Sequence, residues 1–180
     1  GGIDLSTFYS KRFKKTGLTV FASHNSNRAF DPGSTGFTAI PKFERYTINP
    51  RLFVYAGKTV ADIGISYVSE SRTGGSIQYI KHGSPGFYEK NNTGRITAQV
   101  GITHRFNEHF LLQCKNSYSR FNRELSVPAY VFDALQQSTF SELSLGHKGK
   151  NADIVIGLNL LTEQLTEQPR TTDLVRNYHN

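Results

Sequence analysis

The sequence lacks any long apolar run. Hydrophobic residues make up 37% of its 180 residues and the mean hydropathy is −0.44. No segment approaches the roughly 18 consecutive apolar residues of a membrane helix. A transmembrane β-strand, by contrast, is short and half polar, so hydropathy hardly detects it. The composition therefore excludes membrane-spanning helices but leaves membrane-spanning strands open.

Cysteine and methionine are also scarce. Cys114 is the only cysteine, which excludes an intramolecular disulfide and a cysteine-based metal site. It alternates with Phe110 and Leu112, which indicates a small buried or lipid-facing thiol. The chain has no methionine, and it begins with Gly1 already in a strand-like pattern and without a signal peptide. We therefore expect residues 1–180 to be a piece of a longer protein.

Motifs for catalysis and metal binding are missing as well. None of the six histidines stands at metal-ligand spacing, and neither a nucleophile elbow nor a phosphate-binding loop occurs. Asp62 and Glu70 share one face of a predicted strand. The extended chain between them spans about 26 Å, which is too far for the paired carboxylates of a glycosidase. We expect no enzymatic activity, no cofactor and no metal.

The net charge of +7 is not accompanied by a nucleic-acid-binding motif. The densest basic run is KRFKK at 11–15, and its place between two predicted strands favours a solvated turn. The other lysines and arginines are spread singly and often lie near acidic residues. RNA-binding aromatic motifs, zinc fingers and basic helices are all absent. We expect no nucleic-acid partner.

Alternation of residue type is abundant. Segment 96–121, ITAQVGITHRFNEHFLLQCKNSYSRF, alternates apolar and polar residues along two arms that three polar residues separate. Ile96, Val100 and Ile102 fall on one side, and Thr97 and Gln99 on the other. A period of two is typical of a strand with one apolar and one polar face, so this segment is predicted to be a β-hairpin.

The same pattern predicts an all-β, antiparallel up-and-down meander of about eight strands in four hairpins. Pro50 should cause a bulge or a local break in the ladder, because proline cannot donate a hydrogen bond. Gly17 is predicted to take a positive φ in the first turn, and Val131–Gln137 could form one short helical turn. The predicted strand pairs are 3–13 with 18–27, 45–56 with 59–71, 96–106 with 110–121, and 138–147 with 152–167.

The predicted connections alternate in length. Tight turns lie near Lys15, Gly57, Glu108 and Gly149, and long connections cover 28–44, 72–93 and 122–137. This alternation places every tight turn at one end of the sheet, as in outer-membrane barrels with short periplasmic turns and long extracellular loops. We therefore expect the apolar face to contact lipid and the polar face to line a lumen. The alternative is a soluble all-β ligand-binding module whose apolar face is its core.

Five segments carry a resemblance to a known family. They are LTVFASHNSNRAFD, YTINPRLFVY, GISYVSESRTGG, FNEHFLLQCKNSYSRFNRELSVPAY and GLNLLTEQLTE. In this order they resemble the barrel of TonB-dependent outer-membrane receptors of the Bacteroidetes type, from about Leu5 to Gln168. The resemblance implies a partial β-barrel domain from a barrel of about 22 strands, located in the outer membrane of a Gram-negative cell. It also implies energy-coupled uptake of a siderophore, haem, cobalamin or a glycan.

The resemblance also implies partners. The intact receptor would contact outer-membrane lipid and its own plug domain, and it would bind a TonB-type coupling protein through parts that this chain lacks. A complete small eight-stranded outer-membrane barrel is a further alternative. An isolated piece would leave open sheet edges. We expect it to fold over its own apolar face or to associate with a second copy.

Aromatic and basic residues gather in the predicted long connections. Such residues could form the ligand-contacting surface that a transport receptor needs, although packing of loop against loop is the alternative. Tyr9, Tyr46 and Tyr67 are predicted to form an interfacial girdle toward the loop end of the apolar face. The predicted ligand-contacting residues are Arg72, Tyr79, Lys81, His82, Phe87, Tyr88 and Tyr130.

Overall fold

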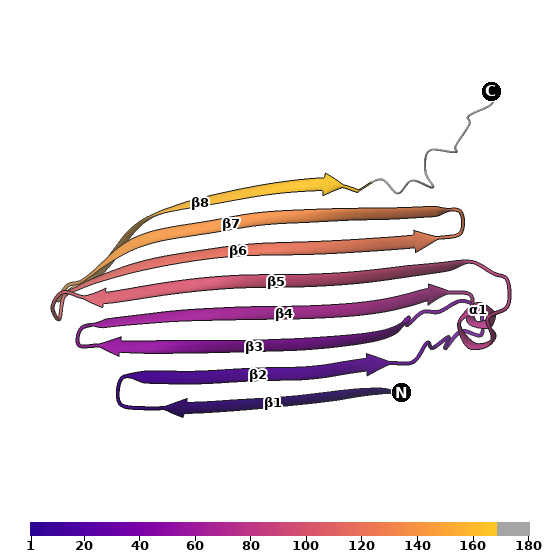
Figure 1. Cartoon of the computed structure of the whole chain (residues 1–180), viewed down its shortest axis with the longest axis horizontal. Coiled ribbons are helices and arrows are strands. Elements are labelled where there is room, and N and C mark those ends of the chain that lie inside the picture. Colours follow the sequence, from indigo (N-terminus) through magenta and orange to yellow (C-terminus); the bar gives the residue numbers. More distant parts are fainter. Residues whose placement is uncertain (169–180) are drawn as a thin grey trace, which may run out of the picture.

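The computed structural model describes residues 1–168, and these form one all-β sheet. Its antiparallel strands lie side by side in chain order from β1 to β8 (Figure 1). They are β1 (Gly2–Arg12), β2 (Thr16–Asn27), β3 (Lys42–Ala56), β4 (Thr59–Gly75), β5 (Tyr88–Arg105), β6 (Phe110–Val127), β7 (Tyr130–Lys148) and β8 (Asp153–Glu167). The predicted meander of eight antiparallel strands is confirmed.

Tight turns join the four hairpins at one end of the sheet, where they were predicted (Figure 1). In the β3–β4 turn Gly57 has a φ of 60°. In the β5–β6 turn the side chain of Asn107 accepts hydrogen bonds from the backbone N–H groups of His109 and Phe110, both at 2.9 Å. Gly17 does not take the predicted positive φ, because it lies inside β2. A Cβ at this position would crowd the ring of Tyr55, so the site needs a small residue.

Two longer connections lie at the opposite end. Residues 28–41 join β2 to β3, and residues 76–87 join β4 to β5. The second connection contains the short helix α1 (Ile77–His82), which ends at Gly83 with a φ of 69°. It is shorter than the predicted connection 72–93, because β4 and β5 both extend into that range.

The predicted long connection 122–137 is wrong, and so is the helical turn at Val131–Gln137. Strand β6 continues to Val127 and β7 begins at Tyr130, so only two residues connect them. Ala129 has the positive φ of 66° that this tight turn requires. Residue types stop alternating in this range, but the hydrogen-bonded ladder continues. Tight and long connections therefore do not strictly alternate.

Pro50 breaks the β3–β4 ladder without shifting it. Ile48 lies opposite Tyr67 and Arg51 lies opposite Gly64, so the register is the same on both sides of the break. Asn49 and Pro50 form no ladder pair with β4, since proline has no N–H to donate. The predicted local break is confirmed, and no bulge accompanies it.

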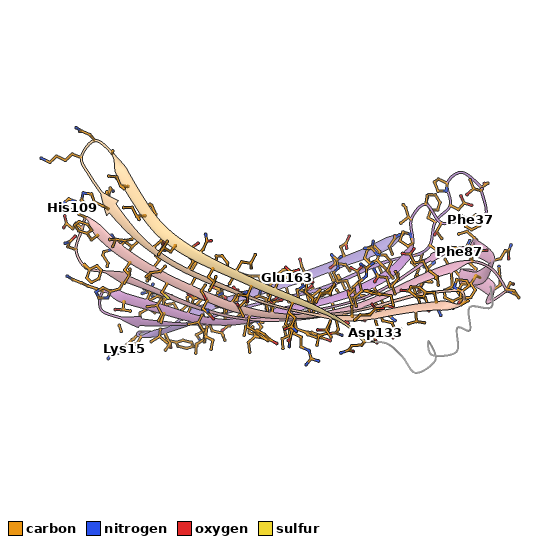
Figure 2. All side chains as sticks on the ribbon, turned by 90° about the horizontal axis from the view of Figure 1, so that it is seen from above. Lys15, Phe37, Phe87, His109, Asp133 and Glu163 are labelled. Atoms are coloured by element: carbon orange, nitrogen blue, oxygen red, sulfur yellow. The ribbon has the colours of Figure 1, made fainter. Side chains whose placement is uncertain are left out.

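The sheet is curved and open. Figure 2 shows it edge-on as a trough, and β1 and β8 are the two edge strands of the sheet that residues 1–168 form. Among residues 1–168, Ala134 is the only buried hydrophobic side chain, with 3% exposure. The sheet therefore encloses no core, and in the single chain it does not fold over its own apolar face. No helix within this range is long and apolar enough to cross a membrane.

Candidate functional site

The two faces of the sheet differ in exposure as well as in polarity. On β5 the apolar residues Ile96, Val100 and Ile102 are exposed, Val100 to 44%, whereas Thr97 and Gln99 are half-buried. Side chains converge on the inside of a curved sheet and spread apart on the outside. The more crowded polar face is therefore concave, and the exposed apolar face is convex.

The apolar side chains of the convex face form a band that crosses the strands obliquely. Ladder partners can be followed from β1 to β8 along lines at right angles to the strands. One line is apolar from β2 to β5 and polar from β6 to β8: Thr7, Ala22, Ile48, Tyr67, Ile96, Arg120, Gln137 and Gln164. The line four residues nearer the tight turns begins at Lys11 and ends at Leu160. We call this oblique zone the apolar band.

The slope of the apolar band follows from the register. The band covers Ile3–Tyr9 in β1 and Ile154–Leu160 in β8. Tyr9 is level with Thr162 of β8, because Thr7 is level with Gln164. From β1 to β8 the band thus shifts by about 26 Å along the strand direction. The seven strand spacings between them add up to about 34 Å, so the band slopes by about 40° from the perpendicular to the strands. Strands of transmembrane barrels lean by about 35–45°.

Aromatic side chains border the apolar band on both sides. Tyr46 and Tyr67 lie at its loop-side edge, as predicted. Tyr9 does not, because β1 runs from the loop end toward the turns and Lys11 follows it, so Tyr9 lies on the turn side. His104 and His147 lie beside tight turns. His104 packs edge-on against Phe106, and His147 stacks on Phe110.

Two one-to-one ion pairs lie on the turn-side half of the concave polar face. Arg51 contacts Asp62 at 3.2 Å and donates to the side chain of Gln99 at 2.7 Å. Lys115 contacts Glu142 at 2.9 Å. A Cβ on Gly101 would collide with the carboxylate of Asp62, so the absence of a side chain there makes room for the ion pair.

Charges on the loop-side half are not balanced in this way. Glu70 accepts from Arg45 Nε at 2.6 Å and contacts Arg72 at 3.0 Å. Arg95 and Arg123 lie on the same face in β5 and β6, and neither has a carboxylate partner in the part of the chain that the structure describes. Arg45 and Arg72 thus share Glu70, and Arg95 and Arg123 have no ion-pair partner among residues 1–168.

The predicted ligand-contacting residues lie partly in strands and partly in the connection 76–87. Arg72 lies in β4, Tyr88 begins β5, Tyr130 begins β7, and Phe87 lies in the connection before β5. Tyr79, Lys81 and His82 belong to α1. The structure brings Tyr79 and Tyr88 together with ring centroids 4.6 Å apart. Arg72 instead belongs to the polar face, where its guanidinium lies 5.7 Å from the ring of Phe43.

The two long connections are joined to each other. Thr38 N donates to Gly75 O and Ile77 N donates to Gly36 O, both at 2.9 Å. Phe37 and Phe87 project from this joined structure, each about half exposed (Figure 2). Loop-to-loop packing and exposed aromatic side chains are therefore both present at the loop end.

Hydrogen bonds to the carboxylate of Asp31 stabilise the connection 28–41. Partial burial of the Asp31 carboxyl acts to raise its pKa, but hydrogen bonds from Gly36 and Thr35 outweigh this and hold the pKa below its ordinary value. The Gly36 N–H donates to Asp31 at 2.7 Å. The ionised carboxylate thereby fixes the turn that carries Phe37.

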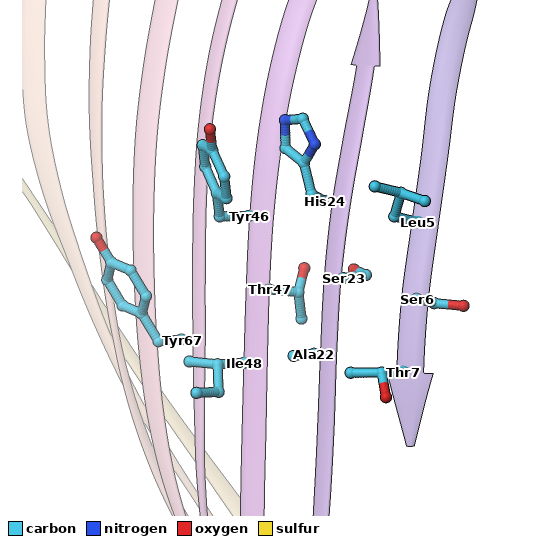
Figure 3. Close-up of a pocket in the computed structure, with 10 residues that line it drawn as sticks. All are labelled: Leu5, Ser6, Thr7, Ala22, Ser23, His24, Tyr46, Thr47, Ile48 and Tyr67. Atoms are coloured by element: carbon cyan, nitrogen blue, oxygen red, sulfur yellow. The ribbon is translucent and has the colours of Figure 1, made fainter. Parts of the chain in front are cut away.

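An apolar groove of about 430 Å³ lies on the convex face (Figure 3). Leu5, Tyr46 and Tyr67 form its larger walls, and the small side chain of Ala22 lies between them. The ring of His24 stacks on Tyr46 at 4.6 Å. The groove is a local hollow in the apolar band near its loop-side edge.

Residues 1–168 contain no group of three or more histidine, cysteine or acidic side chains placed to hold a metal ion. Comparison of the chain with protein-family models, curated proteins and solved structures finds no match. The likeness to TonB-dependent receptors therefore rests on the sequence segments alone.

Of the concave-face arginines, only Arg72 was predicted from the sequence. Arg45, Arg95 and Arg123 were not among the predicted site residues. Strand parity was the available signal, because Arg95 alternates in step with Thr97 and Gln99 on the polar face. Arg123 was assigned to a loop, so its face could not be inferred.

Proposed function

We propose that this chain forms part of the wall of a larger transmembrane β-barrel in the outer membrane of a Gram-negative cell. The apolar band faces lipid and the concave polar face lines a wet lumen. The observation that carries this proposal is the slope of the band, about 40°. When strands tilt in a membrane, a band parallel to the membrane departs from the perpendicular to the strands by the tilt angle. Strands of transmembrane barrels have a tilt of this size.

The soluble alternative fits these observations less well. A soluble sheet buries its apolar face against another layer, whereas here the apolar face is the exposed one and Leu158 reaches 80% exposure. The small eight-stranded barrel is also less well supported, since β1 and β8 do not pair with each other. A larger barrel supplies a neighbouring strand to each edge and lipid to the convex face.

Within this barrel we propose the role of a receptor for energy-coupled uptake, not an enzyme, resembling the TonB-dependent receptors. The resemblance of the five sequence segments supports this, and so do the charged concave face and the exposed aromatic side chains at the loop end. The plug domain would contact the concave face. The coupling protein would bind parts outside this chain.

The proposal is tested by the membrane depth of single cysteines in the full-length protein, after Cys114→Ser. Leu5 in β1 is level with Thr166 in β8 along the ladder. If the band lies in lipid, fluorophores at Leu5→Cys and Leu158→Cys are quenched at the same depth by lipid-attached nitroxides, and one at Thr166→Cys lies outside the bilayer. Equal depth for Leu5→Cys and Thr166→Cys would contradict the proposal, as would recovery of the protein in the soluble fraction.

A further inference from the structure

The loop-side half of the concave face carries an excess of positive charge at four adjacent strands. We call Arg45, Arg72, Arg95 and Arg123 the arginine cluster; they lie on β3, β4, β5 and β6 in that order. Ladder register places them within a few residues of the same level. Arg45 is opposite Glu70, which precedes Arg72 by two residues, and Arg123 is opposite Thr93, which precedes Arg95 by two.

Glu70 is fully engaged by two members of the arginine cluster. One carboxylate oxygen accepts from Arg45 and the other contacts Arg72 at 3.0 Å. These contacts occupy both carboxylate oxygens of Glu70, and its side chain is only 11% exposed. Arg72 nevertheless keeps a buried Nε–H with no hydrogen-bond partner.

Arg95 and Arg123 are diagonal neighbours on adjacent strands, a separation of about 7–8 Å at the backbone. Arg95 lies over the ring of Phe121 at 4.7 Å, and Arg123 donates to the side-chain oxygen of Asn91 at 3.0 Å. Both partners are neutral, so they position the guanidinium groups without cancelling their charge. Like charges at neighbouring sheet positions destabilise a sheet unless an anion lies between them.

Three other carboxylates lie on the same face near the arginine cluster. Glu89 of β5 is opposite Gly74, one diagonal step from Arg72, which is opposite Asn91. The Glu89 side chain is exposed. Asp4 of β1 is two strands from Arg45 and accepts a hydrogen bond from Asn25 at 2.7 Å. Glu167 of β8 is two strands from Arg123. Two strand spacings amount to about 10 Å. Within residues 1–168 none of these three carboxylates forms an ion pair with the arginine cluster.

We propose that the arginine cluster binds a ligand with at least two anionic groups, carboxylate or phosphate, inside the barrel. The inference rests on the proposed function and deepens it, because it names an anionic substrate class and disfavours a neutral glycan. Guanidinium groups present paired N–H donors that match the oxygens of carboxylate and phosphate. The rings of Phe43 and Phe121, beside Arg72 and Arg95, offer flat apolar surface to the rest of the ligand.

The test is calorimetric titration of the detergent-purified full-length protein with citrate, with inorganic pyrophosphate and with neutral maltotriose. We expect one or both anions to bind and maltotriose not to bind. Arg95→Gln and Arg123→Gln should each weaken anion binding about tenfold. Arg120→Gln is the matched control, because Arg120 lies on the opposite face of β6, three residues away. It should leave the affinity within about twofold.

Two results would overturn the inference. One is the absence of binding by both anions, and the other is an equal loss of affinity in Arg120→Gln and Arg123→Gln. Depth measurements on the same preparations separate this test from that of the proposed function. A protein that inserts into membranes but binds neither anion rejects the substrate class alone. A protein that binds anions through Arg95 and Arg123 but does not insert rejects the barrel proposal alone.

Discussion

The convex and concave faces of this sheet are made by alternate residues of the same strands, yet they are stabilised differently. The concave face holds its side chains to one another, through Arg51 and Asp62 or Thr97 and Ser119. The convex face has almost nothing in this chain to pack against. Period-two alternation reveals that two faces exist. The curvature and the relative exposure then show which face is inside, and here the polar one is.

The largest difference between the two faces should come from an added charge. Ile63 lies in the middle of the apolar band on β4, and Ser66 lies three residues away on the concave face. Ile63→Arg should cost about 2–4 kcal/mol of stability in lipid vesicles, because the guanidinium would face the bilayer midplane. Ser66→Arg should cost less than about 0.5 kcal/mol, since it enters the wet lumen. Urea midpoints of the two variants measure this, and equal midpoints would show that the faces are wrongly assigned.

A smaller effect is expected from steric crowding. Gly101→Val should cost about 1–3 kcal/mol, because the new side chain displaces the Asp62 carboxylate from Arg51. Ala98→Val, on the exposed apolar side of the same strand, should be close to neutral. The same unfolding assay compares them. A larger loss from Ala98→Val would mean that the convex face is packed against protein.

Removing a side-chain hydrogen bond between neighbouring strands should change stability in opposite directions on the two faces. Asn116 donates to Ser141 at 2.7 Å on the convex face, and Thr97 donates to Ser119 at 3.1 Å on the concave face. In lipid, Asn116→Leu should stabilise the protein by about 0.5–1 kcal/mol, because leucine gains apolar contact there. Thr97→Val should instead lose about 0.5–1 kcal/mol. Stabilisation by Thr97→Val would reverse the assignment of the wet face.

The smallest effect concerns a loop that belongs to neither face. The pKa of Asp31 is held below its ordinary value, so its hydrogen bonds stabilise the turn at high pH. This contribution is lost as the pH falls through the lowered pKa. Amide exchange at Gly36 should therefore become less protected in acid, while the amides of β5 keep their protection. Asp31→Asn should remove most of the pH dependence, and an unchanged profile in that variant would exclude this carboxylate as the cause.

The sequence was informative where alternation is clean and failed where it is not. The meander, the four tight turns and the break at Pro50 follow from residue period and proline chemistry. The stretch 122–137 was mistaken for a loop because a strand that leaves the apolar band loses its pattern but keeps its backbone hydrogen bonds. The arginine cluster was missed for a different reason. It depends on a register between strands that residue types on one strand cannot supply.

The slope of the apolar band has a consequence for assembly. If these strands stood upright in a bilayer, Lys11 at one side or Arg120 at the other would enter hydrocarbon, because both are level with apolar side chains of β3 and β4. If the strands tilt along the slope of the band, both charged side chains stay outside the hydrocarbon. The lean is thus encoded in this segment's own side chains, before any ring of strands exists to impose it. A partly built wall of the proposed barrel would already enter the membrane at its final inclination, and each later hairpin would inherit that inclination from its neighbour.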